Sequence, residues 1–338
     1  MANYDIGIDL GTTKIIIYVH GKGIVLNEPA VVAYNHKTKK VIAVGKEAAV
    51  MLGRTPDYIS TESPLKEGVI SNMDLTELMI KEFLKKVSES MMVKPRVAIC
   101  VPSAITDVET RAVVMAASFA GARKVYLIEE PIAAAIGAGI DISRPNGFIV
   151  VDIGGGTTDV AVISLNGIVE KKSIKIAGSN LDEAISKYIL KTHKILIGEL
   201  MAENIKCEIS NVYNPSDDKF TIIKGRHLLT GLPQKLKISE KEIYRALKEP
   251  VDNIIKGITD VLEKTPPELA GDIYANGLLL TGGGALLGGF AELLQSQINT
   301  KVIIADDPIV SVAIGTGKAF DYIDELGEGF VHAPIRKH

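Results

Sequence analysis

The chain has 338 residues with 38 basic and 41 acidic side chains, so its formal net charge at neutral pH is -3. This near balance gives no support to nucleic-acid binding, for which a strongly basic face is expected. The length favours about two domains, each with its own core, and a hydrophobic content of 46% fits such cores.

Cysteine usage and the start of the chain indicate the compartment. Cys100 and Cys207 lack metal-binding spacing, which is typical of reduced thiols in a cytoplasmic protein. The sequence begins directly with a predicted strand, so we expect no signal peptide. The apolar stretch 277–291 is broken by glycines and is too short to span a bilayer.

The first predicted element is a hairpin over 4–19, with YDIGIDLGTTK at its turn. An apolar strand runs into Asp9, and Gly11, Thr12 and Thr13 form a tight turn before the second strand. Glycine permits the positive φ angles that turn backbone N–H groups outward to bind an anion. A carboxylate at the strand end is suited to hold a divalent cation, directly or through water.

Short elements follow the hairpin. We expect strands over 25–34 and 40–44, a helix over 47–52 and a loop-rich segment over 55–68. The next helix follows Asp74 as N-cap, because Glu77 three residues later completes a capping box.

A hydrophobic tip comes after this helix. Met91, Met92 and Val93 lie in a predicted loop that leads to a buried strand over 96–101. Either these side chains pack back on the domain, or they insert into a membrane or bind a partner. The lysines nearby favour an anionic lipid surface.

Two neighbouring carboxylates are placed at a helix start. A helix over 106–120 and a strand over 124–128 lead to EEPIAAAIGAG, in which Pro131 suits the first helical turn. Glu129 and Glu130 therefore lie at a helix N-terminus. They are either solvated acids favoured by the helix dipole or ligand contacts.

The second half of the chain repeats the first hairpin. The sequence VVDIGGGTTDV places Asp152 at a strand end, followed by Gly154, Gly155, Gly156 and Thr157. One such hairpin alone is compatible with a turn that binds nothing. Two of them indicate similar half-molecules that face each other and present their loops to one shared phosphate chain.

The remaining elements carry a third glycine motif. We expect a helix capped by Ser179 or Asn180, a helix over 199–210, strands and loops over 220–237, a helix over 239–262 interrupted at Pro250, a strand over 277–280, a strand over 302–304, a helix over 310–322 and a loose tail from His332. Glu203 and Lys206 form either a surface ion pair or a grip on a ribose hydroxyl and an adenine edge. The turn Gly282–Gly284, in TGGGALLGG, suits close approach of a nucleotide.

Taken together, these motifs resemble the superfamily of actin and heat-shock-chaperone ATPases, and specifically the MreB family of bacterial actins. The resemblance runs nearly end to end and is carried by IDLGTT (8–13), GKGIVLNEPAVVA (21–33), GRTP (53–56), EEPIAAAIGAG (129–139), VDIGGGTTDVAVIS (151–164), DEAI (182–185), AENIKCEI (202–209) and LLTGGGALLGGF (279–290).

The resemblance implies an α/β, actin-like ATPase fold. Two lobes would each have an RNase H-like core with a mixed sheet and a smaller outer subdomain. The implied inner subdomains are 1–31 with 64–138 and 139–177 with 240–330, the outer ones are 32–63 and 178–239, and 331–338 is a tail.

The same resemblance assigns roles position by position, with ATP or ADP and Mg²⁺ as cofactors. Asp9 and Asp152 would flank Mg²⁺ through water, and Glu130 would polarise the attacking water that Thr157 helps to hold. The phosphates would be cradled by Gly11, Thr12, Thr13, Gly154, Gly155, Gly156 and Thr157, and the nucleoside would be held by Glu203, Lys206, Gly282, Gly283 and Gly284.

Two departures from the family pattern bear on function. Thr13-Lys14 stands where the family usually has Ala-Asn, so we expect Lys14 to contact the phosphates. The N-terminal amphipathic helix of some relatives is missing, so the tip Met91–Val93 and the basic residues Arg336 and Lys337 would provide the membrane attachment.

The leading hypothesis is a slow ATPase coupled to assembly, in which ATP favours filaments and hydrolysis weakens them. The resemblance implies antiparallel double protofilaments of the chain itself, on the inner face of the plasma membrane. Anionic lipids and proteins of membrane shape and wall synthesis would be partners, and nucleic acid would not.

Other functions on this fold stay open at this point. A chaperone-type ATPase needs a substrate-binding domain, which we do not expect in a chain that ends at His338. A small-molecule kinase would use Glu130 as a base towards a hydroxyl group. A nucleotide-binding scaffold would show little turnover.

Overall fold

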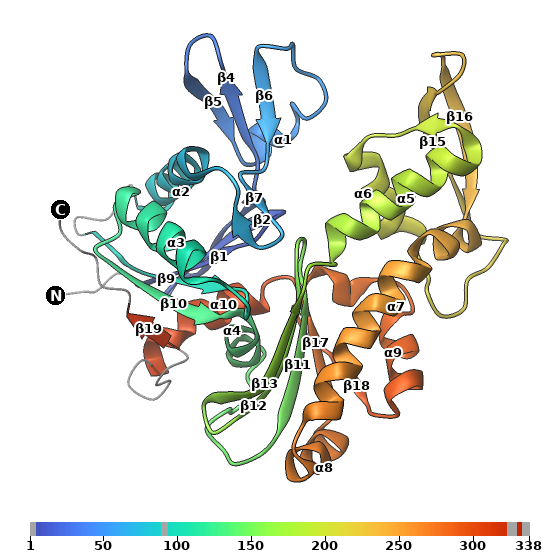
Figure 1. The fold of residues 1–338 in the computed structure, drawn as a ribbon. Helices are drawn as coiled ribbons and strands as arrows, with labels where there is room; N and C mark the ends of the chain where they lie inside the picture. Colours follow the sequence, from blue (N-terminus) through green and yellow to red (C-terminus); the bar gives the residue numbers. More distant parts are fainter. Residues whose placement is uncertain (1–4, 89–93, 323–329, 333–338) are drawn as a thin grey trace.

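The computed structural model of the chain describes residues 5–88, 94–322 and 330–332. Two lobes, each built on a mixed β-sheet, lie side by side, and each carries a smaller block of strands and helices above it (Figure 1). The predicted membrane tip Met91–Val93 and the tail residues 333–338 lie outside the described residues.

The first lobe is built on a six-stranded sheet in the order β19-β10-β9-β1-β2-β3. β1, β9 and β10 run parallel, whereas β2, β3 and β19 are antiparallel to their neighbours. Helices α2 (Met73–Ser88) and α3 (Asp107–Phe119) lie against each other over this sheet (Figure 1). The strands are β1 (Asp5–Leu10), β2 (Lys14–Val19), β3 (Gly23–Pro29), β9 (Arg96–Val101), β10 (Lys124–Glu129) and β19 (Phe330–His332).

The second lobe repeats this plan with a five-stranded sheet in the order β13-β12-β11-β17-β18. Again a hairpin, β11–β12, is extended by a parallel strand, β17. The strands are β11 (Phe148–Ile153), β12 (Thr158–Ser164), β13 (Gly167–Ile174), β17 (Leu278–Thr281) and β18 (Val302–Ile304). The helices of this lobe are α7 (Glu240–Lys264), α8 (Pro267–Asn276), η1 (Gly283–Leu286) and α9 (Phe290–Ile298).

The outer blocks are small sheets with one or two helices each. One contains β5-β4-β6 and α1, and the other contains β14-β15-β16 with α5 and α6 (Figure 1). Their bounds are β4 (Val32–Asn35), β5 (Lys40–Val44), α1 (Lys46–Ala49), β6 (Ile59–Glu62), α5 (Gly178–His193), β14 (Ile195–Leu196), α6 (Glu199–Ile209), β15 (Phe220–His227) and β16 (Pro233–Ser239). A two-stranded ribbon, β7 (Leu65–Lys66) and β8 (Val69–Ile70), follows β6. The predicted subdomain boundaries stay a prediction.

Two helices are exchanged between the lobes at the centre of the molecule. α4 (Glu130–Gly137) follows β10 yet packs on β11 and β12, and α10 (Ser311–Lys318) follows β18 yet packs on β1 and β2 (Figure 1). Small residues allow their close contact, since a Cβ on Gly315 would lie 1.7 Å from the carbonyl oxygen of Ala133. A short 3₁₀ helix, η2 (Ala319–Tyr322), ends the segment.

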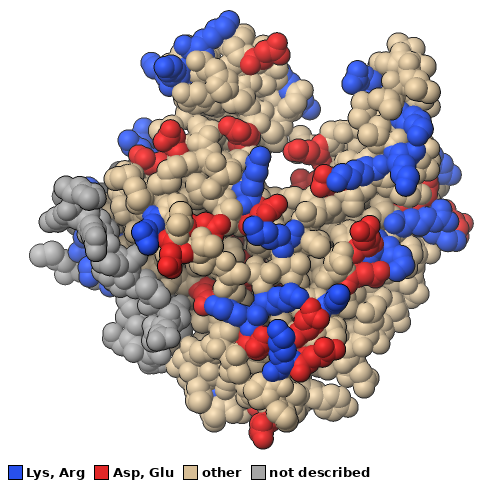
Figure 2. Space-filling view, viewed as in Figure 1, with Lys and Arg blue, Asp and Glu red and all other residues tan. Residues whose placement is uncertain are grey.

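The surface is mixed in charge. Figure 2 shows Lys and Arg interspersed with Asp and Glu over the face in view, and the surface is hollowed between the two outer blocks. The described residues contain no helix that is long and apolar enough to cross a membrane.

The expected interruption of the helix at Pro250 is wrong, because α7 continues from Glu240 to Lys264. Proline inside a helix removes one hydrogen-bond donor and costs about 3 kcal/mol. The apolar face of α7 outweighs that loss: Leu247, Val251 and Ile254 on both sides of Pro250 are at most 1% exposed, and each buried side chain of this size contributes about 1.5–3 kcal/mol.

Two predicted helix caps are also wrong. The cap of α2 is Asn72 rather than Asp74, because the Asn72 side chain accepts from the Leu75 N–H at 3.2 Å. At α5 the helix already begins at Gly178, and Asn180 instead accepts from the Ala177 N–H at 2.9 Å. Both errors arise where several capping residues lie close together in sequence.

Other errors concern strand ends. The strand expected over 25–34 breaks after Pro29, because the Ala30 N–H bonds to the Thr13 carbonyl instead. The loop-rich segment 55–68 also contains two short strands that were not predicted, β6 and β7, and β6 pairs with β4. The tail is not loose at His332, since β19 pairs with β10. The helix expected over 310–322 is divided into α10 and η2.

Candidate functional site

In the first hairpin, a carboxylate near the end of the first strand accepts a hydrogen bond from a thiol. Asp9 lies near the end of β1, and its Oδ1 accepts from the Cys100 Sγ of β9 at 3.3 Å. Burial raises the pKa of Asp9 to about 6, although the bond from Cys100 works against this rise. The turn 11–13 follows, and the Lys14 side chain at the start of β2 is exposed.

The second hairpin repeats the arrangement with a hydroxyl group. Asp152 on β11 is 4% exposed, and its Oδ1 accepts from the Thr281 hydroxyl at 2.7 Å. Burial raises the pKa of Asp152 to about 7, against the effect of this bond, and nearby Asp9 and Asp159 raise it further. The Gly154 N–H closes the following turn on the Thr157 carbonyl at 3.0 Å.

The two glycine turns lie directly against each other. A Cβ on Gly155 would lie 2.4 Å from the Thr13 side chain, and a Cβ on Gly156 would lie 2.3 Å from the Thr12 hydroxyl oxygen. No side chain larger than hydrogen fits at either position unless the loops move apart. The structure therefore brings together two loops that are far apart in the sequence.

Four carboxylates gather behind these turns. The pKa of Glu130, the first residue of α4, is raised well above its usual value by burial first and then by the charges of Asp159, Asp152 and Asp9. Asp159 is fully buried and accepts from the Ser103 N–H at 2.8 Å through Oδ1. Its Oδ2 has no hydrogen-bond partner among the residues that the structure describes.

This cluster fits a divalent cation held largely by water and by a ligand. Within the described ranges, no ion pair joins any of the four carboxylates to a Lys, Arg or His. Buried carboxylates repel each other unless a cation compensates them. The described residues also contain no group of three His, Cys, Asp or Glu close enough to hold a metal ion by themselves. Magnesium typically keeps several waters and binds one or two carboxylates plus phosphates.

The two neighbouring glutamates have different surroundings. Glu129 forms a salt bridge with Lys171 of β13 at 2.8 Å. Glu130 instead belongs to the carboxylate cluster. Only Glu130 is thus placed to act on a ligand beside Asp9 and Asp152.

Two of the predicted nucleoside residues, Glu203 and Lys206, lie on α6. Lys206 donates to Asp182 Oδ2 at 2.9 Å and to the Gly178 carbonyl at 3.0 Å, so its partner is Asp182 on α5 rather than Glu203. Glu203 is exposed on the same helix. Gly178 in turn donates to the Gly154 carbonyl at 3.0 Å, which ties α5 to the second turn.

In the third glycine motif, two glycines pack closely against Ile153 and one faces open space. Gly282 has φ +79°, and a Cβ there would lie 2.3 Å from the Ile153 carbonyl oxygen. A Cβ on Gly284 would lie 2.2 Å from the Ile153 side chain. At Gly283 a Cβ would meet nothing within 4 Å. Gly283 is therefore the member of the turn whose Cα faces open space.

The charge of Lys14 is felt in the opposite lobe. Burial raises the pKa of Cys207 on α6, and the positive charges of Lys206 and Lys14 counteract that rise. The first turn of one lobe and the α6 helix of the other are thus close enough to interact electrostatically.

The sequence did not single out the β7–β8 turn, Asp159 or Ser103. The Gly68 N–H of that turn donates to the Thr12 hydroxyl at 3.0 Å, and Glu67 pairs with Lys175 at 3.3 Å. A sequence signal existed only for Asp159, which is opposite Asp152 in the register of the hairpin.

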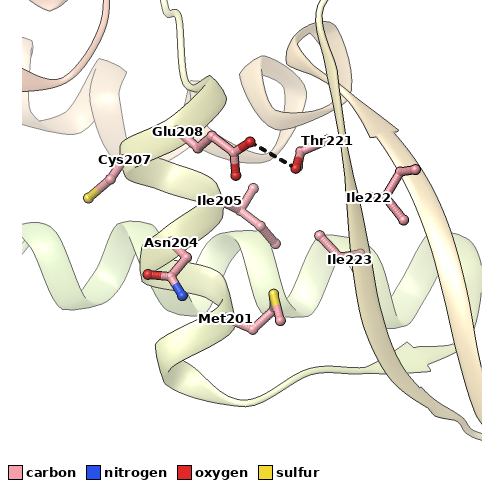
Figure 3. A pocket seen from close by; sticks show the side chains of 8 residues that line it. All are labelled: Met201, Asn204, Ile205, Cys207, Glu208, Thr221, Ile222 and Ile223. Atoms are coloured by element: carbon pink, nitrogen blue, oxygen red, sulfur yellow. Dashed lines mark hydrogen bonds between the residues drawn. The ribbon is translucent and has the colours of Figure 1, made fainter.

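A separate cavity lies away from the carboxylates. It has a volume of about 410 Å³, opens between α6 and β15 and is drawn in Figure 3. Ile205 and Ile223 are buried there, and Glu208 accepts from the Thr221 hydroxyl at 3.0 Å. Its remaining lining residues are Met201, Asn204, Cys207 and Ile222.

Two lobes that present glycine-turn hairpins to each other, joined by an exchanged helix pair, define the actin-like fold. The sequence pattern of the MreB/Mbl proteins matches residues 3–328. The chain belongs to the MreB/Mbl family, which confirms the resemblance seen in the sequence.

Relatives match nearly the whole chain. The cell shape-determining protein Mbl of Bacillus subtilis (strain 168) is 49% identical over 323 residues, which cover 95% of this chain and 97% of Mbl. The cell shape-determining protein MreB of Escherichia coli (strain K12) is 47% identical over 333 residues, covering 97% and 96% of the two chains.

Solved structures agree with the fold. The crystal structure of MreB5 of Spiroplasma citri bound to AMPPNP has a TM-score of 0.89 and 38% identity, and the match covers 96% of this chain and 98% of MreB5. The MamK double helical filament has a TM-score of 0.81 over 95% and 99% of the chains. Its 22% identity supports the fold alone.

Proposed function

We propose that this chain is an ATP-hydrolysing bacterial actin that polymerises and organises cell shape. The observation that carries the proposal is the contact between the two glycine turns, with Asp9, Asp152 and Glu130 behind them, in a chain of the MreB/Mbl family. Relatives at 47–49% identity are named cell shape-determining proteins. MreB5 of Spiroplasma citri was solved bound to AMPPNP and to ADP.

In this proposal the two turns grip one phosphate chain. Gly11, Thr12, Thr13 and Lys14 offer N–H, hydroxyl and ammonium donors from one lobe, and the segment Gly154–Thr157 offers donors from the other. Glu203 and Lys206 hold the nucleoside, and the open position at Gly283 allows its close approach. Asp9 and Asp152 hold the magnesium ion through water, and that ion would neutralise charge on the phosphates.

Glu130 is the group proposed to orient the attacking water, with Thr157 beside it. Phosphoryl transfer to water asks little covalent work of protein groups, so position and charge dominate. A carboxylate whose pKa is raised by burial and by neighbouring acids is a better proton acceptor than a solvated one. Hydrolysis would be slow and coupled to assembly, with ATP favouring filaments.

The assembly proposed is a double filament of antiparallel protofilaments on the inner face of the plasma membrane. Attachment would use the apolar tip Met91–Val93 and the basic residues Arg336 and Lys337. Proteins of membrane shape and wall synthesis would be partners. Liposome pelleting tests the attachment. If a Met91→Ser/Met92→Ser variant and a tail deletion both pellet with liposomes as well as wild type does, this attachment is ruled out.

ATP-dependent sedimentation combined with phosphate release tests the function. We expect wild type to pellet with ATP and release phosphate, and Glu130→Ala to pellet without turnover. Glu129→Ala is the matched control and should keep turnover, because Glu129 is paired with Lys171. No pelleting under any condition would contradict polymerisation, and turnover by Glu130→Ala equal to wild type would contradict the role of Glu130.

A further inference from the structure

Asp9 and Asp152, the two carboxylates proposed to bind the metal ion, each accept a hydrogen bond from a side chain on the neighbouring parallel strand. In the second lobe Asp152 on β11 is paired with Thr281 on the parallel strand β17. In the first lobe Ile8 of β1 is paired with Ile99 of the parallel strand β9, so the next residues, Asp9 and Cys100, lie side by side. The two donors are therefore equivalent in position although they differ in chemistry.

Both donors are inaccessible to solvent. Thr281 is 0% exposed and Cys100 is 3% exposed. A buried hydroxyl needs a partner, and the Thr281 hydroxyl uses Asp152 Oδ1 at 2.7 Å. Cys100 donates to Asp9 Oδ1 at the longer distance of 3.3 Å, as expected for the larger sulfur atom and its weaker S–H group.

These bonds fix the orientation of each carboxyl group and leave one of its oxygens free. In both aspartates Oδ1 is the acceptor, and Oδ2 has no hydrogen bond within the described part of the chain. The backbone of Gly282 also lies close to the Oδ1 atom of Asp152, since a Cβ added to Gly282 would lie 2.8 Å from that oxygen. Rotation of either carboxyl group would break its bond and leave a buried donor unpaired.

We propose that Thr281 and Cys100 are positioning residues that set the carboxylates of Asp152 and Asp9 for the magnesium ion of the bound nucleotide. The inference rests on the proposed function. Residues that orient metal ligands are worth about 10–100-fold in metal affinity or activity. Thr281 contributes more than Cys100, because its hydroxyl is the stronger donor and its bond is shorter.

Thr281 also joins two parts of the nucleotide site. It immediately precedes Gly282 and the open position at Gly283, which is proposed to face the nucleoside. A shift of this turn therefore moves the group that orients Asp152.

The test is a pair of matched substitutions at each position. Thr281→Val removes the hydroxyl at similar volume and Thr281→Ser keeps it, whereas Cys100→Ala removes the thiol and Cys100→Ser keeps a donor. The measurement is calorimetric ATP binding, first in EDTA and then over a magnesium titration. It gives the apparent dissociation constant for Mg²⁺ in the ternary complex, independently of turnover.

We expect Thr281→Val to raise the apparent Mg²⁺ dissociation constant about 10–100-fold while ATP affinity in EDTA stays unchanged, and Thr281→Ser to stay within about 3-fold of wild type. Cys100→Ala should show a smaller rise than Thr281→Val, and Cys100→Ser should stay close to wild type. An equal loss of ATP affinity with and without magnesium would overturn the proposal, because it indicates a merely structural role.

Three further outcomes are decisive. If Thr281→Val does not fold, the Cys100 pair carries the test, and an Mg²⁺ dependence of Cys100→Ala identical to wild type overturns the proposal. If wild type itself binds no ATP with magnesium, the proposed function fails. If wild type binds and all four variants match it, only the present inference fails.

Discussion

The two hairpins share one design but offer different surfaces to a ligand. The first, β1–β2, has an exposed turn with Thr13 and Lys14 at its end. The second, β11–β12, has buried Thr157 and Thr158, and it contributes Asp152 and Asp159 to the carboxylate cluster. Both hairpins carry one aspartate of the carboxylate cluster, but the first turn is accessible and carries a lysine, whereas the second is buried and is followed by a further carboxylate, Asp159. In the function we propose, both hairpins would contribute a carboxylate towards the metal ion, the first turn would add a cation for the phosphates, and the second would add Asp159 beside the attacking water.

The largest effect expected from this division is at Glu130, which lies beside the acids of the second hairpin. Glu130→Gln should lower turnover by about 100- to 10,000-fold while ATP binding persists, because a positioned acid or base contributes this much. Phosphate release under saturating ATP measures it. Glu129→Gln is the control and should stay near wild type. Comparable losses in both variants would show that the helix start, rather than Glu130, matters.

Glycine substitutions separate contact between the hairpins from contact with the ligand. Gly156→Ala should lower the thermal midpoint of the ligand-free protein, since its Cβ would lie 2.3 Å from the Thr12 hydroxyl oxygen. Gly283→Ala should leave that midpoint unchanged, because its Cβ meets no atom within 4 Å, yet should weaken ATP binding. Thermal melting and calorimetry measure the two effects. A stable Gly156→Ala variant would mean that the turns do not touch in solution.

In the absence of nucleotide and magnesium, the aspartates of the two hairpins should also make different contributions to the pH dependence of folding stability. Burial raises the pKa of Asp152 from 3.8 to about 7 and that of Asp9 to about 6. The folded state then binds more protons than the unfolded state between these values, so stability falls as pH rises through that window. Asp152→Asn should have a higher melting temperature than wild type at pH 8, and this difference in melting temperature should shrink towards pH 4.

Asp9→Asn should show a smaller gap that levels off at a lower pH, in line with its smaller shift. Thermal melts in EDTA across the pH range measure both variants. A gap that is constant with pH, or a variant that melts lower at pH 8, would contradict the burial of these charges in the ligand-free protein.

The smallest effects concern the lysines of the two lobes. Lys206→Met should destabilise the protein by about 1–3 kcal/mol, because it leaves the Asp182 carboxylate without its cation. Lys14→Met should leave stability within about 0.5 kcal/mol of wild type, as expected at an exposed site, but should weaken ATP binding. Denaturant unfolding and calorimetry distinguish them. Unchanged ATP binding in Lys14→Met would remove the first turn's cationic role.

Local signals made the hairpins predictable from sequence. Glycines beside threonines, with an aspartate at the end of an apolar strand, specify a turn within a few residues. The element order followed largely from the same local patterns, whereas the α/β, actin-like fold was implied by the resemblance to the MreB family. Pro250 was misread because the helix that contains it is stabilised by packing rather than by propensity.

The rest of the site depends on contacts between distant segments. Cys100 was interpreted only as a reduced thiol, and the pairing of β1 with β9 shows that it holds Asp9. The contact of Gly68 with Thr12 joins residues that no local pattern connects. Lys206 was considered with Glu203 on its own helix, whereas its partner Asp182 is on the preceding one. Contacts between segments that are distant in the sequence can be recognised only once the fold is known.

The measurement that tests the account most directly is a double-mutant cycle of Asp9→Asn and Asp152→Asn, read as magnesium-dependent ATP affinity by calorimetry. If both hairpins serve one magnesium nucleotide, the single variants lose most of that affinity and the double variant loses little more. Fully additive losses would show two independent sites, and undiminished affinity in either single variant would show that one hairpin takes no part.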